Sequence, residues 1–329
     1  MFQPDGYAIT LAMMLVTMVC WGSWANTMKL APGFPFPLFY WDYVIGVILI
    51  SLVLGLTMGS TGGPDAMIAN LRQAGSGSIL YALAGGAVFN VANLLLVAAI
   101  SIAGLAVAFP VGIGLALVVG VLLNYAIAPA GNPLLLFGGV ALVLVAIIVD
   151  ALAYRARGQQ GSHDVGRGLK IAIACGFLMG IFYPLVTKAS EGPAGLGPYS
   201  VSFLFSLGVL LSALVFNTYL MRRPITADPP CSFAGYKVAT PGTHLVGIAG
   251  GAIWGLGMTF SLVAATTHFV GPAVSYAIGQ GATMVSAAWG VFVWREFAGA
   301  PASANKLLAL MFALFLVGLG LVAIAPLYA

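Results

Sequence analysis

Long apolar stretches recur along the whole chain, and this feature limits the possible folds more than any other. A helix that crosses a bilayer needs about 20 mainly apolar residues. About ten such stretches lie near residues 7–28, 38–58, 78–99, 101–123, 134–154, 168–189, 198–220, 243–266, 269–293 and 304–327. Only 6% of the 329 residues are charged, whereas a soluble domain carries roughly 25%. Because the stretches are too long and too uniformly apolar for barrel strands, we expect an all-α membrane protein.

The positively charged residues are concentrated in alternate connections between these stretches. The even-numbered connections carry only Arg72 and Lys188, whereas the odd-numbered ones carry Lys29, Arg155, Arg157, Arg167, Lys170, Arg222, Arg223, Lys237, Arg295 and Lys306. Connections rich in Lys and Arg stay on the cytoplasmic side of a membrane. We therefore expect both termini outside the cytoplasm, in a multi-pass protein of a bacterial inner (plasma) membrane.

The two halves of the chain resemble one another. The segment LAGGAVFNVANLLLVAAI (83–100) is similar to IAGGAIWGLGMTFSLVAA (248–265), and AVAFPVGIG (106–114) is similar to AVSYAIGQG (273–281). A half with five spans places the next half in the membrane with the opposite orientation, and inverted repeats of this kind are typical of secondary transporters. The sequence predicts a first five-helix repeat at 1–154, a short cytoplasmic linker at 155–167 and a second repeat at 168–329.

Further segments add to these two blocks: GSWANT (22–27), YWDY (40–43), GVLLNY (120–125) and SYAIGQGATMVSAAWGVFVWREF (275–297). Through them the chain resembles the drug/metabolite transporter superfamily and, within it, the ureide permease family, which is related to bacterial glucose-uptake and rhamnose–proton symport proteins. The resemblance implies proton-coupled uptake of a ureide or nucleobase-type compound such as allantoin, uracil or xanthine, with a sugar as the alternative. Plant ureide permeases carry a long central loop with a nucleotide-binding-like motif, and residues 154–170 here have none.

The charge distribution supports a neutral solute independently of that resemblance. No Asp, Glu, Lys or Arg occurs between Arg72 and Asp150 or between Lys237 and Arg295. Recognition of a phosphate or nucleotide commonly uses Arg or Lys, so the spans in these stretches favour an uncharged, hydrogen-bonding molecule. No basic patch interleaved with aromatics predicts nucleic acid binding, and no motif predicts an enzyme, a cofactor or a metal site. The oligomeric state and the coupling ion remain open.

Uncharged polar and aromatic side chains within these spans are the candidate substrate ligands: Asn90, Asn93, Phe109, Trp254, Tyr276, Gln280 and Thr283. An amide offers a donor and an acceptor, which matches a ureide, a nucleobase edge or a sugar hydroxyl. Gln280 occupies the repeat position of Ile113, so the repeated packing does not require a polar group there. The alternatives are that the asparagines join neighbouring helices and that the aromatics only pack.

Polar and charged residues also gather around the end of the first span. Trp24 and Asn26 are candidate ligands, while Lys29 and Asp42 are candidates for proton coupling or for a gate. A carboxylate this near the membrane is costly unless it is paired or hydrated. Asp42 is therefore a candidate proton carrier, and a Lys29–Asp42 pair is a candidate gate. The simpler alternatives are that Lys29 extends to the interface, that the tryptophans lie in an aromatic belt, and that Asp42 caps the second span.

Overall fold

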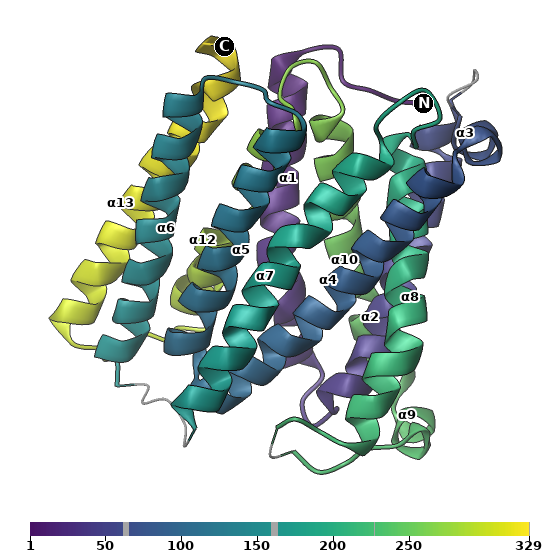
Figure 1. Cartoon of the computed structure of the whole chain (residues 1–329). Coiled ribbons are helices and arrows are strands. Elements are labelled where there is room, and N and C mark those ends of the chain that lie inside the picture. The colour runs from purple at the N-terminus through teal and green to yellow at the C-terminus, as the bar shows by residue number, and fades with distance from the viewer. Residues whose placement is uncertain (62–65, 159–163, 227, 329) are drawn as a thin grey trace.

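The computed structural model describes residues 1–61, 66–158, 164–226 and 228–328, without the side chains of residues 105 and 106. It is a bundle of helices (Figure 1). Nine segments of this described part are helical, long and apolar enough to cross a membrane. They contain α1 (Tyr7–Ser23), α2 (Phe36–Leu56), α4 (Ser76–Ala103), α5 (Leu105–Ile127), α6 (Pro133–Ala156), α7 (Val165–Ala189), α8 (Pro198–Arg222), α10 (Pro241–Ala265) and α13 (Ala302–Ile324). The predicted all-α membrane fold is confirmed.

The predicted ninth span, 269–293, is not one continuous helix. It is divided into α11 (Pro272–Gly279), α12 (Ala282–Ala288) and a π-helical turn, η3 (Trp289–Val293), with a break at residues 280–281. The pair Gln280–Gly281 adopts a turn in which the Gly281 N–H donates to the carbonyl of Ile278 at 2.9 Å. The predicted span is therefore interrupted, with α11 and α12 as short helices on either side of the break.

Both termini lie at the same end of the bundle (Figure 1), and we call it the terminal end. The opposite end, here called the basic end, carries η1 (Trp24–Leu30), α9 (Phe233–Val238), the end of α6 and the start of α7. Two shorter elements, η2 (Met58–Ser60) and α3 (Met67–Gln73), connect α2 to α4, and η4 (Ala325–Tyr328) follows α13. The segment η1 is a 3-10 helix, so the first span changes its helix type near the basic end.

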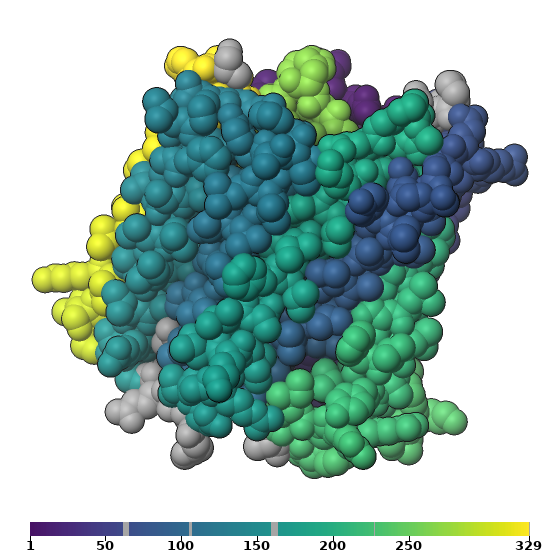
Figure 2. Space-filling view, viewed as in Figure 1, coloured from purple at the N-terminus to yellow at the C-terminus, as the bar shows by residue number. Residues whose placement is uncertain are grey.

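The helices pack in a pattern that repeats between the two halves. Helix α4 packs against α7 and α8, and α10 packs against α1 and α2. Helices α2 and α8 also contact one another, as do α6 and α13. On the face shown in Figure 2, α5, α7, α4 and α8 lie side by side. Each half therefore contributes helices to packing interfaces with the other half.

Two close helix crossings use glycines at corresponding places. A methyl group on Gly46 of α2 or on Gly251 of α10 would overlap the backbone of the other helix. The same is true of Gly86 in α4 and Gly208 in α8. Small residues let helix backbones approach closely in membranes. Gly86 and Gly251 occupy the same place in the two similar sequence blocks, and the structure puts both at such a crossing.

Glycines with positive φ also recur at corresponding turns. Gly104 joins α4 to α5 with a φ of 79°, and Gly271 precedes α11 with a φ of 81°. This part of backbone space is open to glycine and costly for most other residues. Two further pairs follow the same pattern, Gly33 with Gly192 and Gly131 with Gly299. The chain therefore turns at glycines that match between the halves.

Candidate functional site

A central cavity of about 260 Å³ lies among α1, η1, α4, α5, α7, α10 and the α11–α12 segment. This volume is just below the roughly 300–1,000 Å³ of typical small-molecule sites. None of its described lining residues is charged: Trp21, Gly22, Trp24, Ala25, Met28, Phe89, Asn93, Leu96, Val97, Ile100, Phe109, Ile113, Met179, Phe182, Trp254, Gly279, Gln280, Ala282, Thr283 and Ser286. The cavity suits a small, neutral solute.

The break in the α11–α12 segment places Gln280 in the cavity wall. Gln280 is 8% exposed and lines the cavity together with Thr283 and Ser286 of α12. Within the described residues its side-chain amide has no hydrogen-bond partner, although neither of its polar atoms is sealed from the cavity. Interrupted helices carry substrate and ion sites in many transporters. Gln280 can therefore offer both a donor and an acceptor to a solute.

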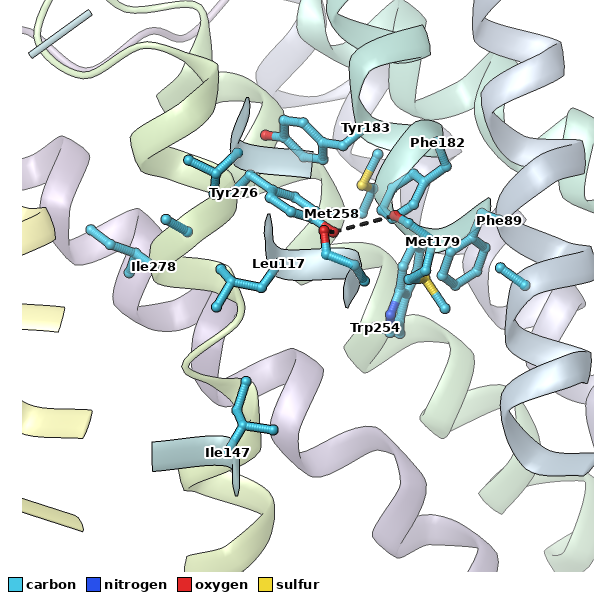
Figure 3. Packing of buried hydrophobic residues seen from close by; sticks show 14 of the residues in the cluster. Phe89, Leu117, Ile147, Met179, Phe182, Tyr183, Trp254, Met258, Tyr276 and Ile278 are labelled. Atoms are coloured by element: carbon cyan, nitrogen blue, oxygen red, sulfur yellow. Dashed lines mark hydrogen bonds between the residues drawn. The ribbon is translucent and has the colours of Figure 1, made fainter. Parts of the chain in front are cut away.

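Aromatic rings form one wall of the cavity. The Trp254 ring is stacked on Phe89 at 4.2 Å between centroids and on Trp21 at 5.8 Å. Figure 3 shows Trp254 and Phe89 in this cluster, with Met179 and Phe182 beside them. Such pairs contribute about 0.5–1.5 kcal/mol each beyond the area that they bury. Trp254 is thus held in place by its neighbours, and Phe109 of α5 is a partly exposed ring in the same cavity.

The two asparagines of α4 have different surroundings. Asn93 lines the cavity, and its Nδ2 lies 3.4 Å from the Tyr40 hydroxyl. Asn90 does not line the cavity, and its Nδ2 donates to the Ser212 hydroxyl at 2.9 Å. Ser212 belongs to α8, so Asn90 joins two packed helices. The structure therefore brings Asn93 to the candidate site and leaves Asn90 in a helix interface.

Tyr276 lies on the side of the cavity toward the terminal end. Its hydroxyl is 3.2 Å from the carbonyl oxygens of both Ala116 and Met179. Its ring is 5.0 Å from that of Tyr183, and both side chains are fully buried (Figure 3). Tyr276 is therefore a closing residue between α5, α7 and α11, and it does not line the cavity.

The cavity has a neighbour at the basic end. A second cavity of about 440 Å³ lies among the segment 33–37, α4, the end of α8 and residues 224–226 and 228–231. Met28 and Val97 line both cavities. The central cavity therefore borders a larger space toward the basic end, whereas packed tyrosines separate it from the terminal end.

Only one of the two η1 candidates, Trp24, lines the cavity. The Oδ1 of Asn26 accepts a hydrogen bond from the Trp294 indole at 2.6 Å, and its Nδ2 donates to the carbonyl of Ser23 at 3.1 Å. The Trp289 indole donates to the Ser23 hydroxyl at 2.8 Å. Because a 3-10 helix has three residues per turn, Ser23 and Asn26 lie on one face. Asn26 therefore connects the first span to the end of the broken one.

Lys29 continues the same face of η1 and binds Glu296. Its Nζ is 2.7 Å from Oε1 of Glu296. The other carboxylate oxygen, Oε2, accepts from the Tyr154 hydroxyl at 3.0 Å and lies 3.6 Å from Arg157. Burial opposes ionisation of Glu296, but the bonds and charges of its three partners outweigh burial, and the pKa of Glu296 is lowered. In this conformation Lys29 is thus not paired with Asp42, because Glu296 occupies its ammonium group.

Asp42 is the seventh residue of α2 and is not at its N-terminus. Its side chain is 1% exposed, and its Oδ2 lies 2.8 Å from Nδ1 of His244 in α10. Its Oδ1 accepts a short hydrogen bond from the Tyr236 hydroxyl of α9. Asp42 is therefore a buried carboxyl group with a hydrogen bond on each oxygen.

Within the described chain no group of three His, Cys, Asp or Glu side chains is arranged to hold a metal ion.

Among the hydrogen-bonding and titratable side chains that the structure brings to these places, sequence reasoning missed Ser286, His244 and Tyr236. Ser286 lies three residues beyond Thr283, the same spacing that separates Gln280 from Thr283, so the predicted face could have been extended to it. His244 lies in the stretch that was described as free of charge, because only Asp, Glu, Lys and Arg were counted there. Tyr236 lies in a connection, and no sequence signal places it near Asp42.

Comparison with protein families gives a match over most of the chain. The family model described as Ureide permease matches residues 39–167 and 158–325. Ureide permease 2 and ureide permease 1 of Arabidopsis thaliana are each 24% identical to this chain, and each alignment covers 96% of both proteins. Ureide permease 5 of the same plant is 23% identical over 94% of this chain and 92% of its own length.

A solved structure described only as "Crystal structure of protein" has a similar fold. It superposes with a TM-score of 0.62 and 18% sequence identity, and it covers 95% of this chain and 98% of its own. At this level of identity the similarity concerns the fold alone.

Proposed function

The chain belongs to the ureide permease family, and from this premise we propose that it is a secondary transporter that imports a ureide or nucleobase-type solute together with a proton. The family supports a membrane transporter of ureide-type solutes rather than an enzyme. The sugar alternative finds no support among these relatives. The observation that carries the proposal is the uncharged central cavity, in which Gln280 stands at a helix break opposite aromatic rings.

The proposed ligands have complementary roles. Gln280 and Asn93 provide amide donors and acceptors, and a ureide or nucleobase presents the matching groups along its edge. Thr283 adds a hydroxyl from the next turn of α12. Trp24, Phe109 and Trp254 give the planar molecule apolar faces to contact. A charged solute would lack a counter-charge in this cavity, so selection against anions follows from its composition.

We propose that transport follows alternating access between inverted repeats. The matching glycine crossings and the matching positive-φ glycines support the repeat with the boundaries 1–154 and 168–329. The neighbouring 440 Å³ cavity supports access from the basic end in this conformation. Tyr276 and Tyr183 would close the opposite side. The basic end would face the cytoplasm, as the distribution of Lys and Arg predicts.

Asp42 is the proposed proton carrier, because it is the carboxyl group buried most completely near the basic end. The Lys29–Glu296 pair is proposed as a gate contact, because it holds η1 against the chain after the broken span. Asp42 and the Lys29–Glu296 pair both lie outside the central cavity.

A ligand screen on the purified protein tests the substrate class. The screen compares the melting temperature with allantoin, uracil, xanthine, glucose and rhamnose, since a ligand that binds the folded state raises it. We expect a rise with the planar nitrogenous compounds and none with the sugars. A rise with sugars alone would reject the proposed substrate class and retain the transporter.

A further inference from the structure

Three elements meet around the buried carboxyl group of Asp42. Helix α2 provides Asp42, α10 provides His244 and α9 provides Tyr236. His244 uses both ring nitrogens: Nδ1 lies 2.8 Å from Asp42 Oδ2, and Nε2 lies 3.1 Å from the main-chain carbonyl oxygen of Tyr236. The His244 side chain is 23% exposed, so the cluster has a route to water that Asp42 itself lacks.

The partners of these atoms fix the number of protons in the cluster. A carbonyl oxygen only accepts hydrogen bonds, and a carboxylate only accepts as well, whereas a neutral imidazole has a single N–H. Both His244 bonds therefore form only when the Asp42–His244 pair holds one proton more than a carboxylate and a neutral imidazole. That proton makes His244 an imidazolium, or it makes Asp42 an acid that donates to Nδ1. Either form satisfies both contacts.

The other half of the molecule shows that packing does not require this pair. The crossing of α4 with α8 matches the crossing of α10 with α2 through Gly86, Gly251 and their contacts. In that matching crossing, Leu204 stands where Asp42 does and Ile79 stands where His244 does. Charged or titratable groups are costly within a membrane and commonly mark ion or proton pathways. The pair is therefore an addition to one copy of a crossing that packs without it.

The cluster is connected to the wall of the central cavity. Tyr43 follows Asp42 on α2, and its ring lies 4.8 Å from that of Trp24 and 6.3 Å from that of Trp254. Both tryptophans line the cavity. A change in the position of α2 or α10 at the cluster would thus reach the aromatic wall through one intervening side chain.

We infer that the Asp42–His244 pair is the proton-binding site of the transport cycle and that Tyr236 of α9 covers it in the proton-loaded state. This inference rests on the proposed proton symport and names the site of coupling. When the proton leaves to water at the basic end, a carboxylate and a neutral imidazole remain. The single N–H stays on Nδ1 beside Asp42, and the lone pair of Nε2 then faces the Tyr236 carbonyl oxygen. That contact is lost, and only the hydroxyl bond of Tyr236 to Asp42 then holds α9 at the cluster, so α9 opens more often.

The phenol of Tyr236 does not compete for this proton. Burial, together with its hydrogen bond to Asp42 and the carboxyl charge, raises the pKa of Tyr236. It therefore remains a neutral donor to Asp42 in the pH range over which a histidine changes charge, about pH 5 to 8. Tyr236 from α9 and His244 from α10 are the titratable groups that contact Asp42 among the residues that the structure describes.

Hydrogen exchange of residues 233–238 tests the inference without any transport assay. In the wild-type protein we expect exchange in α9, corrected for the intrinsic effect of pH, to rise in a transition as the pH is raised and the proton leaves the pair. His244→Gln should abolish that transition, while His268→Gln, at the other end of the molecule, should retain it. A transition that persists unchanged in His244→Gln would overturn the inference. If His244→Gln is not monodisperse, Asp42→Asn takes its place.

Uptake of labelled allantoin into proteoliposomes tests the coupling role. One pH unit is worth about 1.4 kcal/mol per proton, which sustains about tenfold accumulation. We expect this accumulation in the wild type and none in His244→Gln, with solute exchange in the absence of a gradient retained in both. Accumulation by His244→Gln equal to that of the wild type would reject the inference alone. A wild type that exchanges allantoin but ignores the gradient would reject proton symport and, with it, the coupling role.

Discussion

Helix α5 and the α11–α12 segment contain similar local sequences but differ in structure. AVAFPVGIG lies in one continuous helix, α5, although it contains Pro110. AVSYAIGQG ends a helix at Gly279, and the chain restarts as α12 at Ala282. The break thus occurs in the copy without a proline. It falls where Gln280 replaces Ile113, and both of these residues line the central cavity.

This comparison shows where a repeated architecture acquires a specific site. In the α5 copy an intact helix places an apolar side chain in the cavity wall, and neither needs a hydrogen-bond partner from a ligand. The α11–α12 copy offers an amide and an interrupted backbone. A difference between two copies that share their packing is therefore more informative about function than their common features. The Asp42–His244 pair is a second such difference, because the matching crossing has Leu204 and Ile79 at these places.

The largest expected effect is on solute affinity, and it should appear at Gln280 but not at the matching residue, Ile113. Gln280→Leu should weaken allantoin binding by about 1–3 kcal/mol, because a buried polar group of the solute loses its partner, which corresponds to roughly 5- to 150-fold in affinity. Ile113→Leu puts the same side chain at the matching position and should change affinity much less. Isothermal titration of both variants measures the difference. Equal losses would remove the distinction between the two copies.

An effect of similar size, on stability rather than on binding, is expected from a methyl group at matching glycines. Gly279→Ala would place its Cβ 2.6 Å from the Trp21 ring, which is stacked on Trp254. Overpacking of this kind costs typically about 1–3 kcal/mol. At Gly112 the nearest atom is a Leu96 methyl group at 3.3 Å, and alanine gains about 0.5–1 kcal/mol over glycine within a helix.

Melting temperatures in one detergent compare these two variants. We expect Gly279→Ala to melt below the wild type and Gly112→Ala to melt at or above it. The reverse order would mean that the chain around the break is not held as the structure describes.

The smallest effect concerns the closing tyrosine. Tyr276→Phe removes the hydroxyl that meets the carbonyls of Ala116 and Met179, at a cost of about 0.5–1.5 kcal/mol for a typical hydrogen bond. Phe109, the matching residue of α5, has no hydroxyl and makes no such closure. We expect faster solute exchange across the terminal end in Tyr276→Phe than in the wild type. Unchanged exchange would show that this hydroxyl does not help to keep the cavity closed.

Much of the fold is predictable from the sequence, because hydropathy and length determine where a helix can span. The helices begin and end within a few residues of the predicted spans, including 134–154 for α6 and 198–220 for α8. The break at residues 280–281 was not predicted. Glycine and one glutamine within a long apolar run still satisfy the length and hydropathy criteria, so periodicity alone cannot distinguish a turn from a helix there.

The candidate site is predictable only in part, because lining a cavity depends on which helices meet. Gln280, Thr283, Asn93, Trp24, Phe109 and Trp254 do line one cavity. Asn26 and Asn90 carry the same amide but face other helices, and composition cannot separate these cases. Lys29 binds Glu296, which is 267 residues away in the chain, and no local pattern predicts a partner at that distance.

An experimental structure with bound allantoin tests the central claim most directly. The account predicts the solute in the central cavity, with its amide groups within hydrogen-bonding distance of Gln280 and Asn93 and with its ring beside Trp24 or Phe109. Solute bound in the 440 Å³ cavity at the basic end, with Gln280 left unoccupied, would contradict it.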